Sequence, residues 1–183
     1  MADVFDVLVQ DHQVVKQMLS ELEAGAVRPG TSPDQLAQRK KLAEQLIIEE
    51  SRHEAVEEMY FWPAVRERLR HGGELADTAI LQEQQGKEVL AKLDKLDATD
   101  PQFEALLAEF ISAGREHIEY EEAHVWPELR SVLSRDAAAE LGRKITEAKK
   151  TAPTRPTRTH HPPRARSKPP VSSPPPLTRL ATR

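Results

Sequence analysis

The chain has 183 residues, 31% of them charged and 38% hydrophobic, with a formal net charge of −4 at pH 7. This is typical of one soluble globular domain with room for an additional segment. The absence of cysteine excludes disulfides, zinc–thiolate sites and thiol catalysis, so any metal would be held by nitrogen and oxygen. Because no apolar run approaches the roughly 18 residues of a membrane span and the acidic start lacks a secretory signal, we expect no membrane partner and a cytoplasmic location.

Two helices are predicted in the first part of the chain. Inward positions recur every three or four residues, which is the spacing of one helix face. In the first helix they are Phe5, Leu8, His12, Val15, Leu19 and Leu22. The second follows the cap signal Ser32-Pro33-Asp34 and runs to the glycines at 72–73. Its inward positions are Leu36, Ala43, Ile47, Glu50, His53, Glu57 and Tyr60.

Two more helices follow, with short connections. The third spans about residues 75–97. The fourth begins after Pro101 and runs to about residue 148, with Phe103, Leu107, Phe110, His117, Glu121 and His124 on one face. This pattern predicts an all-α, up-down-up-down four-helix bundle over residues 1–148. Pro63 and Pro127 should kink the two long helices just past their His/Glu pairs.

Residues 149–183 differ in composition from the rest of the chain. They contain nine Lys or Arg, nine Pro and no acid, which leaves a net charge of −13 for residues 1–148. Such a basic, proline-rich segment is expected to be disordered. Binding of nucleic acid or an anionic surface through this tail is one interpretation. A solubilising extension of the acidic domain is the other, and no aromatic residue is interleaved for base stacking.

A repeat links the second and fourth helices. The stretches SRHEAVEEMYFWP at 51–63 and REHIEYEEAHVWP at 115–127 superpose with a constant offset of 64. The offset pairs His53 with His117 and Glu57 with Glu121, so each stretch carries H-x-x-x-E. A histidine and a glutamate at i and i+4 present nitrogen and oxygen donors to one ion. His12 adds a third imidazole at an inward position, where an unpaired ring would be costly. Together these residues predict a metal site.

These residues resemble the hemerythrin-like HHE cation-binding domain. A lone histidine on the first helix and H-x-x-x-E on the second and fourth match its pattern over roughly residues 3–140. The resemblance implies a four-helix bundle with a non-haem di-iron centre, thus two iron ions per chain. It implies as ligands His12, His53, Glu57, His117 and Glu121. Members of the family are linked to oxygen binding, to iron or oxygen sensing, and to handling of peroxide or nitric oxide.

The third helix departs from the family pattern because it has no histidine. Glu83 falls opposite His12 and near the middle of the arc formed by Ile80, Leu90 and Leu93, so it is the predicted sixth ligand. A shift of one residue would bring Gln84 forward instead, although a neutral amide is a poor iron ligand. The alternative is a surface glutamate and a site with a single metal.

The offset of 64 also pairs Tyr60 with His124, each seven residues past its histidine. Their position predicts hydrogen-bond partners of the ligands or an additional ligand. Ordinary, partly exposed residues are the alternative. The preferred function is a di-iron protein that binds or reacts with oxygen, peroxide or nitric oxide. Peroxide consumption or ferrous-iron oxidation would make it an enzyme. The alternative is a helical interaction module, with an acidic bundle, a basic tail and at most one weakly bound metal.

Overall fold

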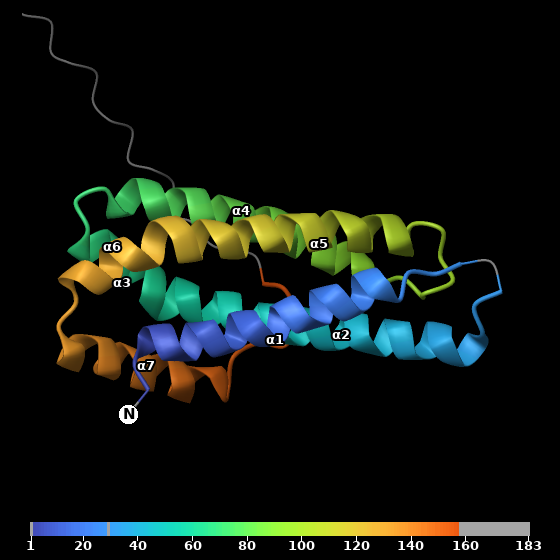
Figure 1. Ribbon diagram of the computed structural model, residues 1–183, viewed down its shortest axis with the longest axis horizontal. Coiled ribbons are helices and arrows are strands. Elements are labelled where there is room, and N and C mark those ends of the chain that lie inside the picture. Colours follow the sequence, from blue (N-terminus) through green and yellow to red (C-terminus); the bar gives the residue numbers. More distant parts are fainter. Residues whose placement is uncertain (1, 29, 158–183) are drawn as a thin grey trace, which may run out of the picture.

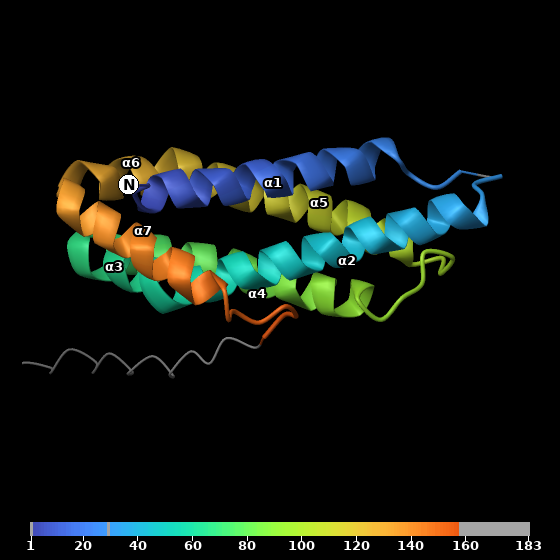
Figure 2. The same cartoon turned by 90° about the horizontal axis from the view of Figure 1, so that it is seen from below.

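The computed structural model describes residues 2–28 and 30–157, and within these ranges it contains helices and no β-strand. Four long helical arms alternate in direction and pack side by side (Figures 1 and 2). The predicted all-α, up-down-up-down bundle is therefore confirmed. The helices are α1 (Val4–Ala24), α2 (Pro33–Val56), α3 (Trp62–Arg68), α4 (Gly72–Leu93), α5 (Phe103–Tyr120), α6 (Trp126–Val132) and α7 (Arg135–Lys149).

The first two helices begin at side-chain caps that the sequence encodes. At α1, Asp3 accepts hydrogen bonds from the backbone of Phe5 and Asp6. At α2, Ser32 accepts from Gln35, and Pro33 occupies the first turn, where its missing N–H costs nothing. These caps satisfy backbone donors that the helix itself leaves unpaired.

Both arms of the repeat are irregular just past their His/Glu pairs, but the irregularity does not begin at the prolines. The irregularity begins earlier, at π-helical turns η1 (Glu57–Phe61) and η2 (Glu121–Val125), which join α2 to α3 and α5 to α6. In each turn the backbone N–H of the following tryptophan donates a hydrogen bond to the backbone carbonyl of the glutamate five residues earlier. Pro63 and Pro127 then lie in the first turn of the next helix. The π-turns start at the two glutamates of the repeat, so the unusual backbone coincides with the predicted site.

The fourth arm ends earlier than predicted, and a separate helix follows it. Leu133 is extended, and the Ser134 hydroxyl accepts a hydrogen bond from the Ala137 N–H to cap α7. α7 turns back and packs on α1 and α2 (Figures 1 and 2). Residues 150–157 continue over the bundle surface, where Arg155 Nε lies 3.0 Å from Asp94 Oδ2. The remainder of the predicted disordered tail, 158–183, lies outside the described residues.

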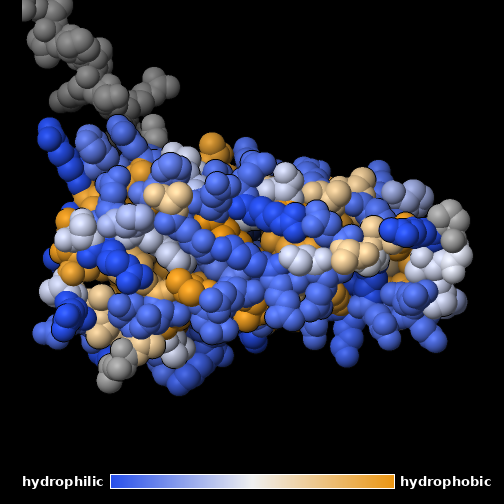
Figure 3. Space-filling view, viewed as in Figure 1, coloured by the Kyte–Doolittle hydropathy of each residue, from blue (hydrophilic) through white to orange (hydrophobic). Residues whose placement is uncertain are grey.

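A polar layer divides the core into two apolar clusters. One cluster surrounds Phe5, Leu8 and Trp62, and the other surrounds Leu19, Leu46 and Leu107. Between them the helices bury ionisable side chains. These are His12, Glu50, His53, Glu54, Glu57, Glu83, Lys87, His117 and Glu121. Hydrophilic side chains cover most of the outer face in Figure 3, and no described helix is long and apolar enough to cross a membrane.

Replacing Ser134 by alanine tests whether α6 and α7 are separate helices. Because the Ser134 hydroxyl caps α7, its loss should lower the free energy of unfolding by about 1 kcal/mol in urea denaturation. Within one continuous helix the same change would be stabilising, since alanine is the better helix former. A variant at least as stable as the unchanged protein would contradict the break.

Candidate metal centre

The structure brings the six predicted ligands together in the polar layer. Among the described residues, two sets of four side chains have donor atoms within 4.8 Å of one another, and every member is buried. The first set is His12, His53, Glu57 and Glu121, and the second is Glu57, Glu83, His117 and Glu121. α1, α2 with η1, α4, and α5 with η2 each contribute, so the cluster forms only when all four arms of the bundle pack.

Two shared carboxylates connect the sets. Each H-x-x-x-E pair meets across one helical turn, with His53 Nε2 3.2 Å from Glu57 Oε2 and His117 Nε2 3.2 Å from Glu121 Oε1. The other oxygen of Glu121, Oε2, lies 3.3 Å from His12 Nε2. One carboxylate therefore reaches both sets, so it could contribute to holding a cation in either.

On α4, Glu83 rather than Gln84 belongs to the cluster. Glu83 is 2% exposed, and the Trp62 indole N–H donates a hydrogen bond to its Oε1. Lys87, one turn further along α4, is also buried and lies 3.8 Å from Glu83 Oε2. Gln84 is half-buried and lines a surface pocket together with Pro156. The helix register that puts Glu83 on the inner face is the one expected from the apolar arc.

Each histidine is held from outside by a residue of a neighbouring helix. His12 Nδ1 lies 2.9 Å from Glu122 Oε1. His53 Nδ1 lies 3.4 Å from Asp11 Oδ2, and His117 Nδ1 lies 3.2 Å from Gln82 Oε1. Such partners fix the tautomer and the ring orientation, which leaves Nε2 directed at the cluster.

The repeated tryptophans also contact the cluster, although sequence reasoning gave them no role. Trp62 bonds Glu83, whereas the Trp126 ring stacks on His12 with centroids 4.7 Å apart and an interplanar angle of 19°. Their signal was the repeat itself, in which both tryptophans occupy equivalent positions. Residues on the opposing helices, such as Asp11 and Gln82, carried no comparable signal.

Tyr60 and His124 do not contact the cluster and agree with the alternative of ordinary residues that are at least partly exposed. His124 is exposed, with its ring 5.5 Å from that of Tyr120, and Tyr60 is half-buried against the apolar cluster that contains Phe5. A π-turn holds one residue more than an α-helical turn, so it rotates the residues after Glu57 and Glu121 away from the predicted face. Glu122 and Asp11 contact the ligand histidines instead.

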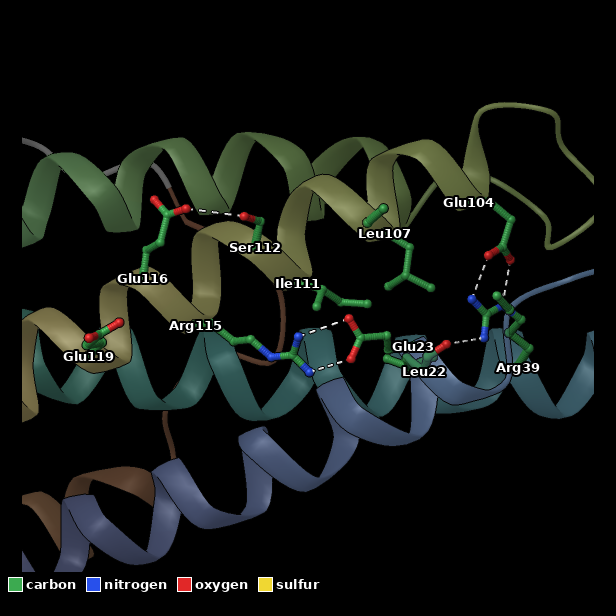
Figure 4. Close-up of a pocket in the computed structure, with 12 residues that line it drawn as sticks. Leu22, Glu23, Arg39, Glu104, Leu107, Ile111, Ser112, Arg115, Glu116 and Glu119 are labelled. Atoms are coloured by element: carbon green, nitrogen blue, oxygen red, sulfur yellow. Dashed lines mark hydrogen bonds and ion pairs between the residues drawn. The ribbon is translucent and has the colours of Figure 1, made fainter.

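The surface pocket in Figure 4 is a different feature. It lies along α1 and α5, and Leu22, Leu107 and Ile111 contribute to its lining. Four of its charged residues are paired with each other: Arg39 bonds both oxygens of Glu104, and Arg115 bonds both oxygens of Glu23. None of the six cluster residues lines it, and all six are buried within the bundle.

Burial and mutual repulsion shift the pKa values of the cluster when no cation is bound. Burial raises the pKa of Glu57 well above its usual value, and the Glu121 carboxylate adds to this. Burial also raises the pKa of Glu83 to about 8, although nearby His117 and Lys87 oppose the change. Burial lowers the pKa of His117, but the Glu121 carboxylate outweighs it and raises that pKa to about 9.

The cluster leaves buried polar atoms without hydrogen-bond partners, and a bound cation would satisfy them. The imidazole nitrogens that lie 3.2 to 3.3 Å from Glu57 and Glu121 are not aligned for hydrogen bonds. Both oxygens of Glu57 and Glu121, Oε2 of Glu83 and Nε2 of His117 are therefore buried without a hydrogen-bond partner. Each such atom costs free energy, and native proteins bury few of them. Cations within the cluster would satisfy them together, and imidazole and carboxylate donors suit hard or borderline metals such as iron.

Comparisons with known proteins agree with this geometry. The family model of the hemerythrin HHE cation binding domain matches residues 3–129. A hemerythrin-like protein of Schizosaccharomyces pombe is 30% identical over 111 residues, which is 60% of this chain and 55% of that protein. The chain thus spans about half the length of this curated relative. The crystal structure of a hemerythrin HHE cation binding domain-containing protein from Mycobacterium kansasii shares the fold, with a TM-score of 0.67 at 21% identity over 82% of this chain and 87% of that one.

The shifted pKa values predict how pH affects the metal-free protein. Between its ordinary value of 4.5 and about 8, Glu83 holds a proton in the folded state that the unfolded chain has released. His117 does the same between 6.5 and about 9. The folded state therefore binds more protons, and its stability is lost as the pH rises through this window.

We expect the melting temperature with excess chelator to fall between pH 5.5 and pH 9. The increase in melting temperature caused by metal should become larger over the same pH range, because deprotonated ligands bind cations more tightly. Melting curves at three pH values, with and without chelator, measure both trends. If the melting curves with and without chelator were identical at every pH, a buried metal centre would be contradicted.

Proposed function

Because the chain belongs to the hemerythrin HHE cation-binding domain family, we propose that its cluster holds two iron ions and that the loaded protein handles a small oxidant, namely oxygen, peroxide or nitric oxide. The observation that carries the proposal is the pair of four-residue sets that share Glu57 and Glu121. Two ions held by these sets would use six buried atoms of Glu57, Glu83, His117 and Glu121 that packing leaves without a hydrogen-bond partner. The cytoplasmic location expected from the composition belongs to the same proposal.

The donor set favours consumption of the oxidant over reversible carriage. Three histidines and three glutamates form the cluster, and the second set has a single nitrogen donor, from His117. Bound iron would supply one-electron redox chemistry, and anionic oxygen donors favour its ferric state. Peroxide consumption or ferrous-iron oxidation therefore fits this chain better than oxygen carriage.

The protein supplies orientation and exclusion of water. Glu122, Asp11 and Gln82 hold the three imidazoles in place, and the stacked Trp126 ring covers His12. The two apolar clusters lie on either side of the polar layer along the bundle axis and shield it from water. Within such a low-dielectric enclosure the fixed charges of the ligands act strongly on any group that enters.

Iron content of His117→Ala tests the assignment. Removal of the only imidazole in the second set should lower bound iron by at least half, from about two ions per chain. His124→Ala is the matched control, since this exposed histidine lies seven residues further along the same arm. The content is measured on protein from iron-supplied cells. Equal iron in both variants would contradict the proposed ligand set.

Oxygen cycling tests the preference for oxidant consumption. The protein is reduced anaerobically, exposed to oxygen and then evacuated, and its spectrum should not return to the starting di-ferrous form. Full recovery over repeated cycles would indicate reversible carriage instead.

Glu83→Ala should bind less iron, whereas Gln84→Ala should bind the normal amount. Unchanged iron in Glu83→Ala would remove the structural basis of the preference.

A further inference from the structure

α7 begins beyond the residues matched by the family model, yet it reaches the metal centre. The Lys149 ammonium, at its last residue, forms an ion pair with Asp11 Oδ1. The other oxygen of the same carboxylate, Oδ2, lies 3.4 Å from His53 Nδ1. Asp11 therefore stands between a cation on α7 and a residue of the first set.

We propose that Lys149 is a positioning residue of the centre: by fixing Asp11 it orients the His53 ring toward the metal, so that α7 is a working part of the site. This inference rests on the proposed function. Lys149 does not touch the metal ligands, and its influence passes through the Asp11 carboxylate. His53 and Asp11 belong to different helices, so their alignment is not set by either helix alone.

Burial makes this contact more than an ordinary surface ion pair. The side chains of Lys149, Asp11 and His53 are 21%, 13% and 3% exposed, so shielding from water increases inward along the series. Exposed ion pairs contribute little because solvent screens them. Here Asp11 is mostly enclosed, and without Lys149 its carboxylate would gain hydration by turning outward, away from His53.

The histidines of the first set share this arrangement. His12 is held by Glu122, whose two oxygens accept hydrogen bonds from Lys16 at 2.7 and 2.8 Å. His53 is held by Asp11, which is paired with Lys149. In both cases a lysine fixes the carboxylate that orients the imidazole. Lys16 belongs to α1 of the bundle, whereas Lys149 comes from the added helix.

A close backbone contact sets the register of α7 on α1. A Cβ atom at Gly142 would lie 2.7 Å from the Asp3 carbonyl carbon and 2.8 Å from the Val4 nitrogen, so only glycine allows this approach. From Gly142 to Lys149 is seven residues, as it is from Val4 to Asp11. At 1.5 Å per residue both intervals span about 10.5 Å. The two helices run in the same direction in Figure 1 and are in contact, although α7 slopes toward α2 in Figure 2. The contact at Gly142 therefore places Lys149 level with Asp11.

The test compares Lys149→Met with Lys150→Met in the full chain. Lys150 is the matched control, because it is adjacent, exposed and paired only with Glu147 among the contacts described. Loss of an outer partner of a ligating histidine lowers metal affinity by about 10- to 100-fold. Lys149→Met leaves that partner, Asp11, in place but frees it to turn away, so we expect one of the two iron ions to be released to a chelator at the low end of this range, about tenfold faster. Lys150→Met should match the unchanged protein, and Lys149→Arg should restore slow release because it keeps the ion pair.

Melting temperatures separate positioning from simple stabilisation. If Lys149 only anchors α7, Lys149→Met will lower the melting temperatures of the metal-free and loaded forms equally. A positioning role predicts that metal loading raises the melting temperature of Lys149→Met by less than it raises that of the Lys150→Met control. Gly142→Ala, which moves α7 away from α1, should reduce this increase in the same way.

The outcomes distinguish this inference from the proposed function. Slow release of both ions from Lys149→Met, or an equal loss of stability in both forms, overturns the role of Lys149 and leaves the di-iron centre standing. An unchanged protein that binds no iron overturns the proposed function, and the role of Lys149 fails with it. Faster release of one ion, together with rescue by arginine, supports both.

Discussion

A layer of ionisable side chains in the middle of an apolar bundle is the constraint on which this structure depends. Carboxylates and imidazoles that leave water lose hydration, and like charges at close range repel each other. Lys87 offsets part of this cost, since it lies among Glu54, Glu58 and Glu83. It does not reach the shared oxygens of Glu57 and Glu121, which have no hydrogen-bond partner. Bound cations would remove the remaining penalty, so the same residues that weaken the empty bundle define its metal centre.

The π-turns reconcile this layer with the helices on either side of it. Each begins at a glutamate of the cluster and ends before a Trp-Pro pair. The extra residue in the turn changes which side chains face inward, so that Trp62 and Trp126 meet Glu83 and His12. In a regular helix the inward positions would fall on Tyr60 and His124. The local backbone thus exchanges two polar candidates for two large rings that enclose the centre.

The replacement of histidine by Glu83 on α4 changes the charge of the centre, and its neighbours accommodate the change. A buried carboxylate would repel Glu57 and Glu121, but Lys87 one turn further and the Trp62 N–H both favour an anion at this position. The lysines that fix Glu122 and Asp11 act in the same sense on the opposite side. The electrostatic balance therefore extends over α1, α4 and α7, well beyond the donor atoms themselves.

The sequence by itself determined the bundle and the repeated His/Glu pairs, because helical periodicity and a constant offset of 64 can be read directly along the chain. On the third helix it favoured Glu83 and left Gln84 open, and the tertiary structure decided between them. The same offset equates Leu69 with Leu133, both extended in the structure, so the end of α6 also had a signal, although the acidic and alanine-rich residues after it read as a continuing helix. Only the tertiary structure decided the outer partners. Asp11 and His53 are 42 residues apart, and Lys149 is 138 residues from Asp11. Contacts between such distant residues depend on how helices pack and on a glycine that allows α7 to approach α1, and neither leaves a periodic pattern in the sequence.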